Sequence, residues 1–215
     1  MNPSYRLEKL NRAARRRITK LRTVVGPLSL PVSPEADRLV AWTIIEARNL
    51  WASFLRAYYL SAAIRAKTTS GKRIDFVSVA LPDVPSALRF AVQCLKDPNF
   101  RKAIVSRRDE PTWDNASDFL KLLGRVGASN LPRIQAGFAY TTTFFVFLPP
   151  IRNFYAHLCD DTFRKAGNVG VKLGLSATPN LHATEIMCSR FPRRPQNIAT
   201  DWLDDIGNVI DLLCS

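Results

Sequence analysis

The chain has 215 residues, of which 47% are hydrophobic and 23% are charged. This composition supplies one sizeable core and excludes an intrinsically disordered chain. There are 31 Lys and Arg against 18 Asp and Glu, giving a formal charge of +13 and a pI near 10.1. Such a charge attracts polyanions, and nucleic acid is the commonest of them. The alternatives are a cationic surface that serves only solubility and one that meets an acidic partner protein.

Cysteine and histidine usage argues against a metal centre. The four cysteines are widely spaced without a CxxC pair, and there are only two histidines. We therefore expect no zinc or iron–sulfur site and no other cofactor. Disulfides are possible, but a chain of this length does not need them, and free buried thiols are the simpler expectation. No secretory h-region is present at the N-terminus, and the apolar stretch 140–150 is too short to span a bilayer. We expect a cytoplasmic protein with no membrane association.

The first predicted element is a basic helix. Residues 1–22 hold eight basic residues and one acid, and their apolar residues recur at spacings of three and four. The run Arg15, Arg16 and Arg17 could bind an RNA backbone. The equal alternative is an ordinary helix that packs its leucine stripe on the core and leaves its basic face in solvent. Three prolines between residues 27 and 34 then form a linker, so we divide the chain into 1–26 and a helical domain, 27–215.

A long helix follows the linker. Ser33 is the expected N-cap, and no Gly or Pro interrupts the chain before about residue 66. Glu46 and Asn49 are polar residues within this broad apolar helix, and both are candidates for a supporting role near a site. After it, residues 74–79 form either a short strand or an extended loop.

The remaining chain reads as a series of shorter helices. Helix-start residues and apolar spacing predict them at 85–95, 97–105, 115–124, 160–173, 183–191 and from 197 or 200 to 214. Another starts at Pro132 and reaches the aromatic run 140–147, where a strand is the alternative. The fold class is therefore mainly α, with at most one short extended segment.

The segment 152–157, Arg-Asn-Phe-Tyr-Ala-His, is the best candidate for chemistry. Pro149 and Pro150 predict a stop and a new helix, so Arg152 should lie in a first turn, where free N–H groups suit a phosphate. Asn153 and His157 are four apart and share one helix face, while Arg152 is about 140° from His157. The bland alternatives are a histidine bonded in a helix interface and a surface ion-pair arginine. His182, in a loop, is expected to be structural or exposed.

These residues carry a resemblance to a known family. The segment 152–157, preceded by two prolines and followed by Asp-Asp-Thr at 160–162, resembles the signature helix of HEPN domains, in particular the RiboL-PSP-HEPN branch of bacterial conflict systems. Residues 46–51, Glu-Ala-Arg-Asn-Leu-Trp, resemble that branch as well. The resemblance covers about 35–215. It implies a helical bundle, a homodimer and metal-independent endoribonuclease activity in many members, with Arg152, Asn153 and His157 as catalytic residues.

The resemblance also implies a biological setting, with two departures. Family members often serve as toxins or phage-defence effectors, which would bring an antitoxin or a defence-system partner. In members that a small nucleotidyltransferase silences, a tyrosine shortly after the motif histidine is modified. Here Leu158, Cys159 and Asp160 follow His157, so that control is not expected. Members also typically have a basic residue where this chain has Leu158.

Three functions remain open at this stage. The first is an RNase that uses the 2′-OH of RNA as nucleophile at a site made by two copies of the motif. The second is a non-catalytic HEPN module that binds RNA or a partner protein. The third is a DNA-binding regulator that uses the arginine-rich N-terminus, which no helix-turn-helix spacing supports.

Overall fold

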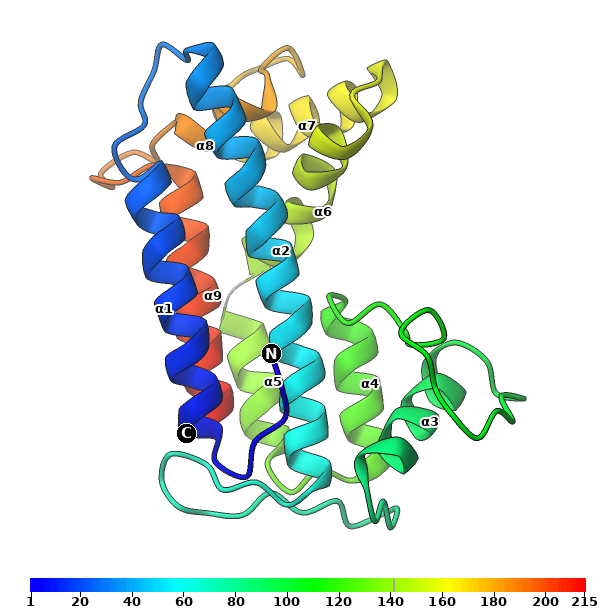
Figure 1. Ribbon diagram of the computed structural model, residues 1–215. Coiled ribbons are helices and arrows are strands. Elements are labelled where there is room, and N and C mark those ends of the chain that lie inside the picture. The colour runs from blue at the N-terminus through cyan, green and yellow to red at the C-terminus, as the bar shows by residue number, and fades with distance from the viewer. Residues whose placement is uncertain (141) are drawn as a thin grey trace. The chain divides into compact units, whose positions relative to one another are not determined.

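The computed structural model describes residues 1–140 and 142–215, which form nine helices and no sheet (Figure 1). The predicted mainly α fold class is confirmed. No helix within these residues has the length and apolar character needed to cross a membrane. The helices are α1 (Leu7–Val25), α2 (Pro34–Ala63), α3 (Val84–Leu95), α4 (Ala116–Val126), α5 (Leu131–Tyr140), α6 (Thr142–His157), α7 (Asp160–Lys172), α8 (Ala183–Cys188) and α9 (Ile198–Cys214).

The chain divides into two compact units. Unit 1 comprises Met1–Ala14, Trp51–Tyr140 and Val209–Ser215, and unit 2 comprises Arg15–Leu50 and Thr141–Asn208. Helices α1, α2 and α9 contribute residues to both units. The domain boundary expected near residue 26 stays a prediction.

Helix α1 has the amphipathic character that its sequence predicts. Its apolar residues are buried at every turn, while most of its basic residues are exposed or half-buried. The helix thus buries one stripe and leaves a cationic face in solvent. The buried stripe consists of Leu7, Leu10, Ala14, Ile18, Leu21 and Val25.

Unit 1 is built on the aromatic second half of α2. The Trp51 ring meets Phe138 of α5 edge-on at 5.8 Å, and the Tyr58 ring meets Phe119 of α4 at 6.0 Å. Asn130 donates a hydrogen bond of 2.7 Å to the buried Tyr58 hydroxyl. Aromatic side chains of this size bury the most apolar area per residue, so they dominate the stability of this core.

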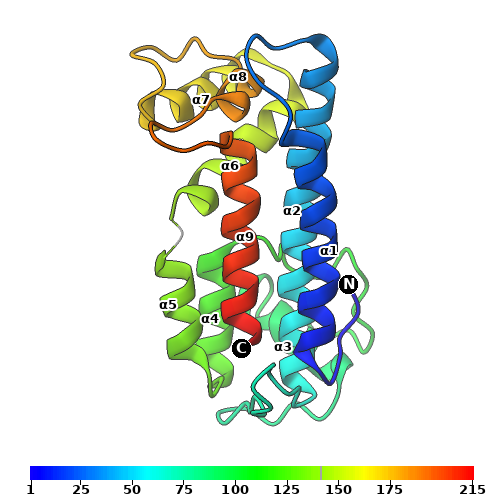
Figure 2. The ribbon, with the colours of Figure 1, turned by 90° about the vertical axis from the view of Figure 1, so that its left-hand side faces the viewer.

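Unit 2 joins the first half of α2 to α6, α9 and the second half of α1. The buried Phe144 of α6 meets the Trp202 ring of α9 edge-on at 6.1 Å. In this unit α1 lies beside α9 (Figures 1 and 2), and Arg22 forms an ion pair of 3.0 Å with Asp204. The buried Asn197 side chain donates to the carbonyls of Val25 and Leu28 at 2.7 and 3.0 Å, which satisfies the end of α1.

One sequence expectation is wrong in unit 1. Residues 97–105 form no helix, because Asp97 accepts a hydrogen bond from the Asn99 backbone at 2.9 Å and turns the chain locally. Side chains of α3 hold the following loop: Gln93 donates to the Phe100 carbonyl at 2.9 Å. Of the two alternatives left open for residues 74–79, the structure has the extended loop, with one isolated bridge from Phe76 to the turn after α4.

Candidate active site

The candidate segment lies at the end of α6, not at the beginning of a helix. Helix α6 continues through Pro149 and Pro150 and ends at His157. The expected position of Arg152 in a first turn is therefore wrong. A helix ends with a partial negative charge, so the α6 dipole suits a cation here rather than a phosphate.

Helix α6 passes through its two prolines because its apolar stripe is continuous. Phe144, Leu148, Ile151 and Phe154 are buried at spacings of four, three and three. Each such side chain contributes about 1.5–3 kcal/mol on burial. A proline inside a helix costs about 3 kcal/mol. Tertiary burial is thus large enough to override the local stop signal.

Arg152 and Asn153 form a hydrogen-bonded pair on this helix. The Arg152 Nη1 atom donates to Asn153 Oδ1 at 3.2 Å. Arg152 is half-buried, and its buried Nε atom has no hydrogen-bond partner among the described residues. Because this Nε atom is buried, its N–H cannot reach an external phosphate, and only the accessible part of the half-buried guanidinium could contact a phosphate oxygen.

His157 is the last residue of α6 and is exposed. Its ring takes part in no hydrogen bond or ion pair within the described ranges. Asn153 lies one turn earlier and is also exposed, so the expected shared face of the two residues is present. The alternative interpretation, a histidine hydrogen-bonded inside a helix interface, does not apply to this exposed side chain.

The neighbours of the segment on α6 anchor it within unit 2. Phe154 is buried and meets the His182 ring edge-on at 4.8 Å. The Tyr155 hydroxyl pairs with the Thr184 hydroxyl at 2.9 Å, and burial raises the pKa of Tyr155. The Thr184 hydroxyl in turn donates to Asp37 of α2. These contacts hold α6 against α8 and the start of α2, so Phe154 and Tyr155 serve as packing residues.

His182 packs against the candidate segment through Phe154, a contact that the sequence did not predict. Its Nδ1 atom accepts a hydrogen bond from the Thr184 backbone at 3.3 Å, so His182 caps α8. The same atom lies 3.7 Å from Asp37 Oδ1. Position 182 lies 25 residues beyond His157 in the sequence, and no local pattern indicates that its ring packs on Phe154.

Cys159 begins α7 directly after the segment. Cys159 is exposed and is the N-cap residue, and its backbone N–H donates to Thr162 Oγ1 at 3.1 Å. The Thr162 hydroxyl also contacts the thiol at 3.5 Å, and this bonding lowers the pKa of Cys159. The predicted helix start at 160–162 is confirmed.

Glu46 and Asn49 form a separate cluster. Glu46 accepts hydrogen bonds from Asn49 at 3.1 Å and from Arg17 at 3.0 Å. Within the described residues, no hydrogen bond or ion pair joins either of them to Arg152, Asn153 or His157. Their supporting role near the site stays a prediction.

The three N-terminal arginines have different surroundings. Arg17 is paired with Glu46 at 3.0 Å, and the half-buried Arg15 guanidinium lies over Gly207 of α9. A Cβ atom at Gly207 would stand only 2.2 Å from Arg15 Nη1. Arg16 is exposed and, within the described part of the chain, free of ion pairs. Of the three, Arg16 is the one most open to a nucleic-acid phosphate.

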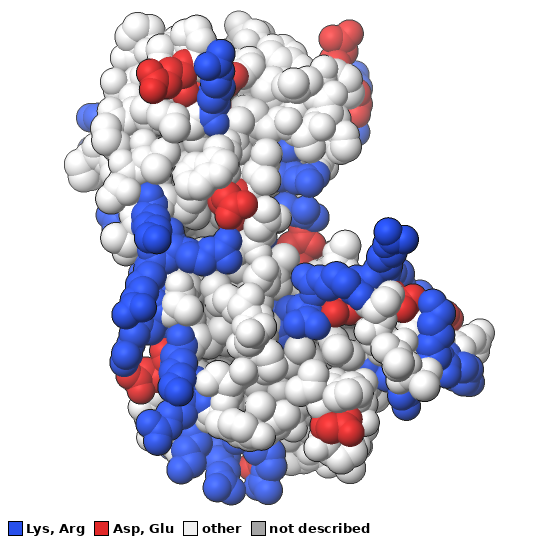
Figure 3. Space-filling model, in the orientation of Figure 1, with Lys and Arg blue, Asp and Glu red and all other residues white. Residues whose placement is uncertain are grey.

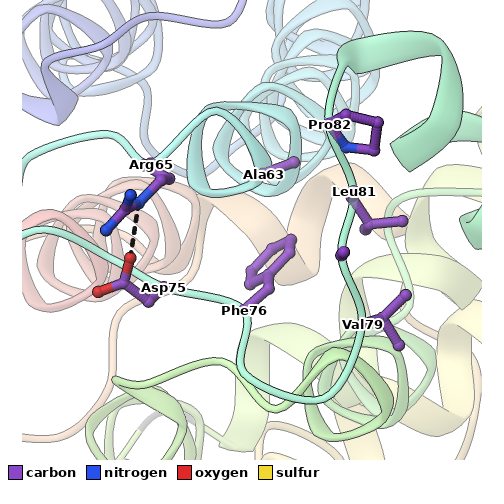
Figure 4. A pocket seen from close by; sticks show the side chains of 8 residues that line it. Ala63, Arg65, Asp75, Phe76, Val79, Leu81 and Pro82 are labelled. Carbon is purple, nitrogen blue, oxygen red and sulfur yellow. Dashed lines mark hydrogen bonds and ion pairs between the residues drawn. The ribbon is translucent and has the colours of Figure 1, made fainter.

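A pocket in unit 1 is a weaker candidate for chemistry. It encloses about 340 Å³, and Figure 4 shows Arg65 directed at Asp75, with which it forms an ion pair of 2.8 Å. The rest of its lining is apolar and contains no histidine, cysteine or second carboxylate. The pocket is lined by Ala63, Arg65, Asp75, Phe76, Val79, Ala80, Leu81 and Pro82.

Comparison with known proteins adds no assignment: no family model, curated protein or solved structure matches the chain. In the described residues no group of three or more His, Cys, Asp or Glu side chains could hold a metal ion. Arg152, Asn153 and His157 therefore remain the candidate site on the strength of their own geometry and chemistry.

Proposed function

We propose that the chain is a metal-independent endoribonuclease of the HEPN class, a cytoplasmic toxin or phage-defence effector. The supporting observation is the end of α6, where an exposed His157 follows the hydrogen-bonded pair of Arg152 and Asn153. A net charge of +13 favours a polyanionic substrate.

The proposed reaction uses the nucleophile that RNA carries. The 2′-oxygen attacks the adjacent phosphorus, and the bond from phosphorus to the 5′-oxygen breaks. His157 either removes the 2′-OH proton or protonates the leaving 5′-oxygen. Arg152 stabilises the negative charge that grows on the phosphate oxygens, and Asn153 orients its guanidinium. The products are a 2′,3′-cyclic phosphate and a 5′-hydroxyl.

Two proton transfers call for two groups, and one chain supplies one motif histidine. A C2 homodimer that brings the ends of two α6 helices together would supply the second. We therefore propose a composite site at a dimer interface, restrained in the cell by an antitoxin or a defence-system partner.

The test is RNA cleavage by the purified protein in EDTA. Wild-type protein should cut RNA, and His157→Ala should lower the rate by at least about a hundredfold, as loss of an acid–base group does. Arg152→Ala should also lose activity, whereas the matched control Arg164→Ala on α7 should keep it, because Arg164 is exposed and its ion pair is with Asp161 of the same helix. Equal cleavage by wild type and His157→Ala would disprove the proposal.

The second candidate is a non-catalytic HEPN module that binds RNA or a partner protein. The position of His157 at the carboxyl end of α6 favours it, because the helix dipole there opposes a bound phosphate. This candidate predicts salt-sensitive RNA binding without cleavage and no effect of His157→Ala on binding.

A further inference from the structure

Three segments of unit 1 are held side by side by backbone hydrogen bonds. The Lys67 N–H donates to the Tyr5 carbonyl at 2.9 Å, and the Leu7 N–H donates to the Lys67 carbonyl at 2.9 Å. The Thr68 N–H donates to the Lys72 carbonyl at 2.8 Å. The start of α1 and the loop after α2 therefore present their side chains at one fixed place.

These segments surround a hollow of about 360 Å³ with a cationic lining. Its volume lies within the range of about 300–1,000 Å³ that is usual for ligand sites. Four of its side chains are exposed cations, and none is acidic. Figure 3 shows Lys and Arg gathered at the lower edge of the view, over the start of α1 and this loop. The lining residues are Tyr5, Arg6, Ile64, Arg65, Lys67 and Arg73.

The cations of the hollow are largely free to meet an external anion. Arg65 is paired with Asp75, as Figure 4 shows. Arg6, Lys67 and Arg73 have no ion pair among the residues that the structure describes. Like charges held together by the backbone repel one another, and a bound polyanion relieves that repulsion.

An exposed aromatic ring completes the hollow. Tyr5 is 71% exposed, although its backbone is fixed by Lys67. A flat ring beside several cations is the combination that binds single-stranded nucleic acid, because the base stacks on the ring and the cations contact the phosphates. A duplex keeps its bases stacked on each other and offers no free base face to Tyr5.

We propose that this hollow binds single-stranded RNA, with one base on Tyr5 and the neighbouring phosphates on Arg6, Lys67 and Arg73. The choice of RNA over DNA rests on the proposed function, whereas the stacking and the phosphate contacts rest on the hollow alone. An acidic peptide would satisfy the cations but would leave the Tyr5 ring without a partner. A membrane surface would require more exposed apolar anchors than Tyr5 and the half-buried Ile64.

Binding of a fluorescent single-stranded RNA oligonucleotide, measured by anisotropy across a salt series, tests the proposal. All proteins carry His157→Ala, so that the RNA stays intact. Tyr5→Ala should weaken binding on the order of tenfold, the usual effect of losing one stacked base. The pair Arg6→Gln and Arg73→Gln should lower the slope of log affinity against log salt by about 1.4, or about 0.7 per lost phosphate contact.

The matched control removes the same charge elsewhere in unit 1. Lys121 and Arg125 are exposed on α4, and converting both to Gln should leave the salt slope unchanged. Arg65→Gly offers a further variant, because Arg65 has φ 59°, where glycine is favoured, so its cation can be removed without backbone strain.

The outcomes test the binding site, the choice of RNA over DNA and the membrane alternative separately. Equal binding by Tyr5→Ala, the double Arg variant and the control would overturn the proposal. Equal affinity for DNA of the same sequence would overturn the assignment to RNA. Tyr5-dependent binding to anionic vesicles would replace RNA by a membrane. If the wild type cleaves RNA and these variants bind RNA normally, the proposed ribonuclease function is supported and the proposed binding site is wrong.

Discussion

At the scale of single residues, the Glu110 side chain accepts more hydrogen bonds than any side chain of the candidate site makes. Its side chain is 4% exposed and accepts two hydrogen bonds from Arg56, at 2.6 and 2.8 Å. Arg107 and the Trp113 indole donate to it at 2.8 and 2.9 Å. Burial raises the pKa of Glu110, but these donors outweigh it and hold the pKa below its ordinary value.

Glu110→Ala should therefore destabilise the protein strongly. It leaves Arg56, whose side chain is 21% exposed, without its counter-charge, and breaking such a pair costs about 3–5 kcal/mol. Urea unfolding followed by circular dichroism measures the loss. Glu8→Ala removes an exposed pair with Arg12 and should cost less than about 1 kcal/mol. Equal losses for the two variants would contradict this view of Glu110.

At the scale of elements, α6 shows how a tertiary effect defeats a local signal. Two adjacent prolines normally begin a helix, because Pro has no N–H to donate and fits a first turn. Here both lie inside α6, between buried residues of one stripe.

Pro149→Ala should raise the free energy of unfolding by about 1–3 kcal/mol, since it restores a donor inside the helix and removes a steric clash. Thermal melting measures the change. Pro34→Ala is the matched control: Pro34 lies in the first turn of α2, where proline fits, so this change should lower stability by about 0.4–1 kcal/mol. A lower melting temperature for Pro149→Ala would indicate that the helix begins at the prolines.

Helix α9 carries a second testable feature, a half-buried carboxylate among acidic neighbours. Burial and the nearby Asp201 and Asp204 raise the pKa of Asp205 to about 6, with Arg194 opposing them. The folded state thus binds the Asp205 proton more tightly than the unfolded state, whose pKa is near 3.8. The stability from this group is present below pH 3.8 and is lost as the pH rises toward 6.

Asp205→Asn should remove that loss. After allowance for solvent near a half-buried group, we expect the variant to gain about 1–2 kcal/mol relative to wild type between pH 4.5 and pH 7. Urea unfolding of both proteins at the two pH values measures this difference, in which the titration of all other carboxylates cancels. An identical pH dependence of the two proteins would show that Asp205 titrates normally.

Sequence reasoning succeeded where the signal was local. The Ser33 hydroxyl accepts from the Ala36 backbone at 3.1 Å, as an N-cap should, and Asn115 caps α4 in the same way. Sequence reasoning failed where a contact joins residues that are far apart in the chain. The contact of Thr184 with Asp37 spans 147 positions, and neither residue belongs to a pattern that indicates the other. The packing of His182 on Phe154 was missed for the same reason.

At the scale of the whole molecule, positive charge is spread over both units, but its surroundings differ. In unit 2, Arg17 and Arg22 are used in ion pairs with acids of the same unit. In unit 1, Arg6, Lys67 and Arg73 line a hollow without an acid. Net charge alone favoured a polyanionic partner. It could not tell cations that are paired with an acid from cations that are free, because that depends on which acidic side chains the fold places beside them.

The four cysteine thiols also differ in their surroundings, and this difference makes Cys159, at the start of α7, a site for selective labelling. Cys159 is exposed with a lowered pKa, whereas Cys188 and Cys214 are buried, and burial raises the pKa of Cys214 to about 12. A maleimide at pH 7 should therefore react first at Cys159, because the thiolate is the reactive form.

Peptide mass mapping after brief labelling would identify the modified thiol, and first labelling of another cysteine would contradict the expectation. The consequence is that the chain already carries an attachment point two residues beyond His157. A spin label there would let the distance between the α6 ends of two associated copies be measured directly, without any engineered cysteine.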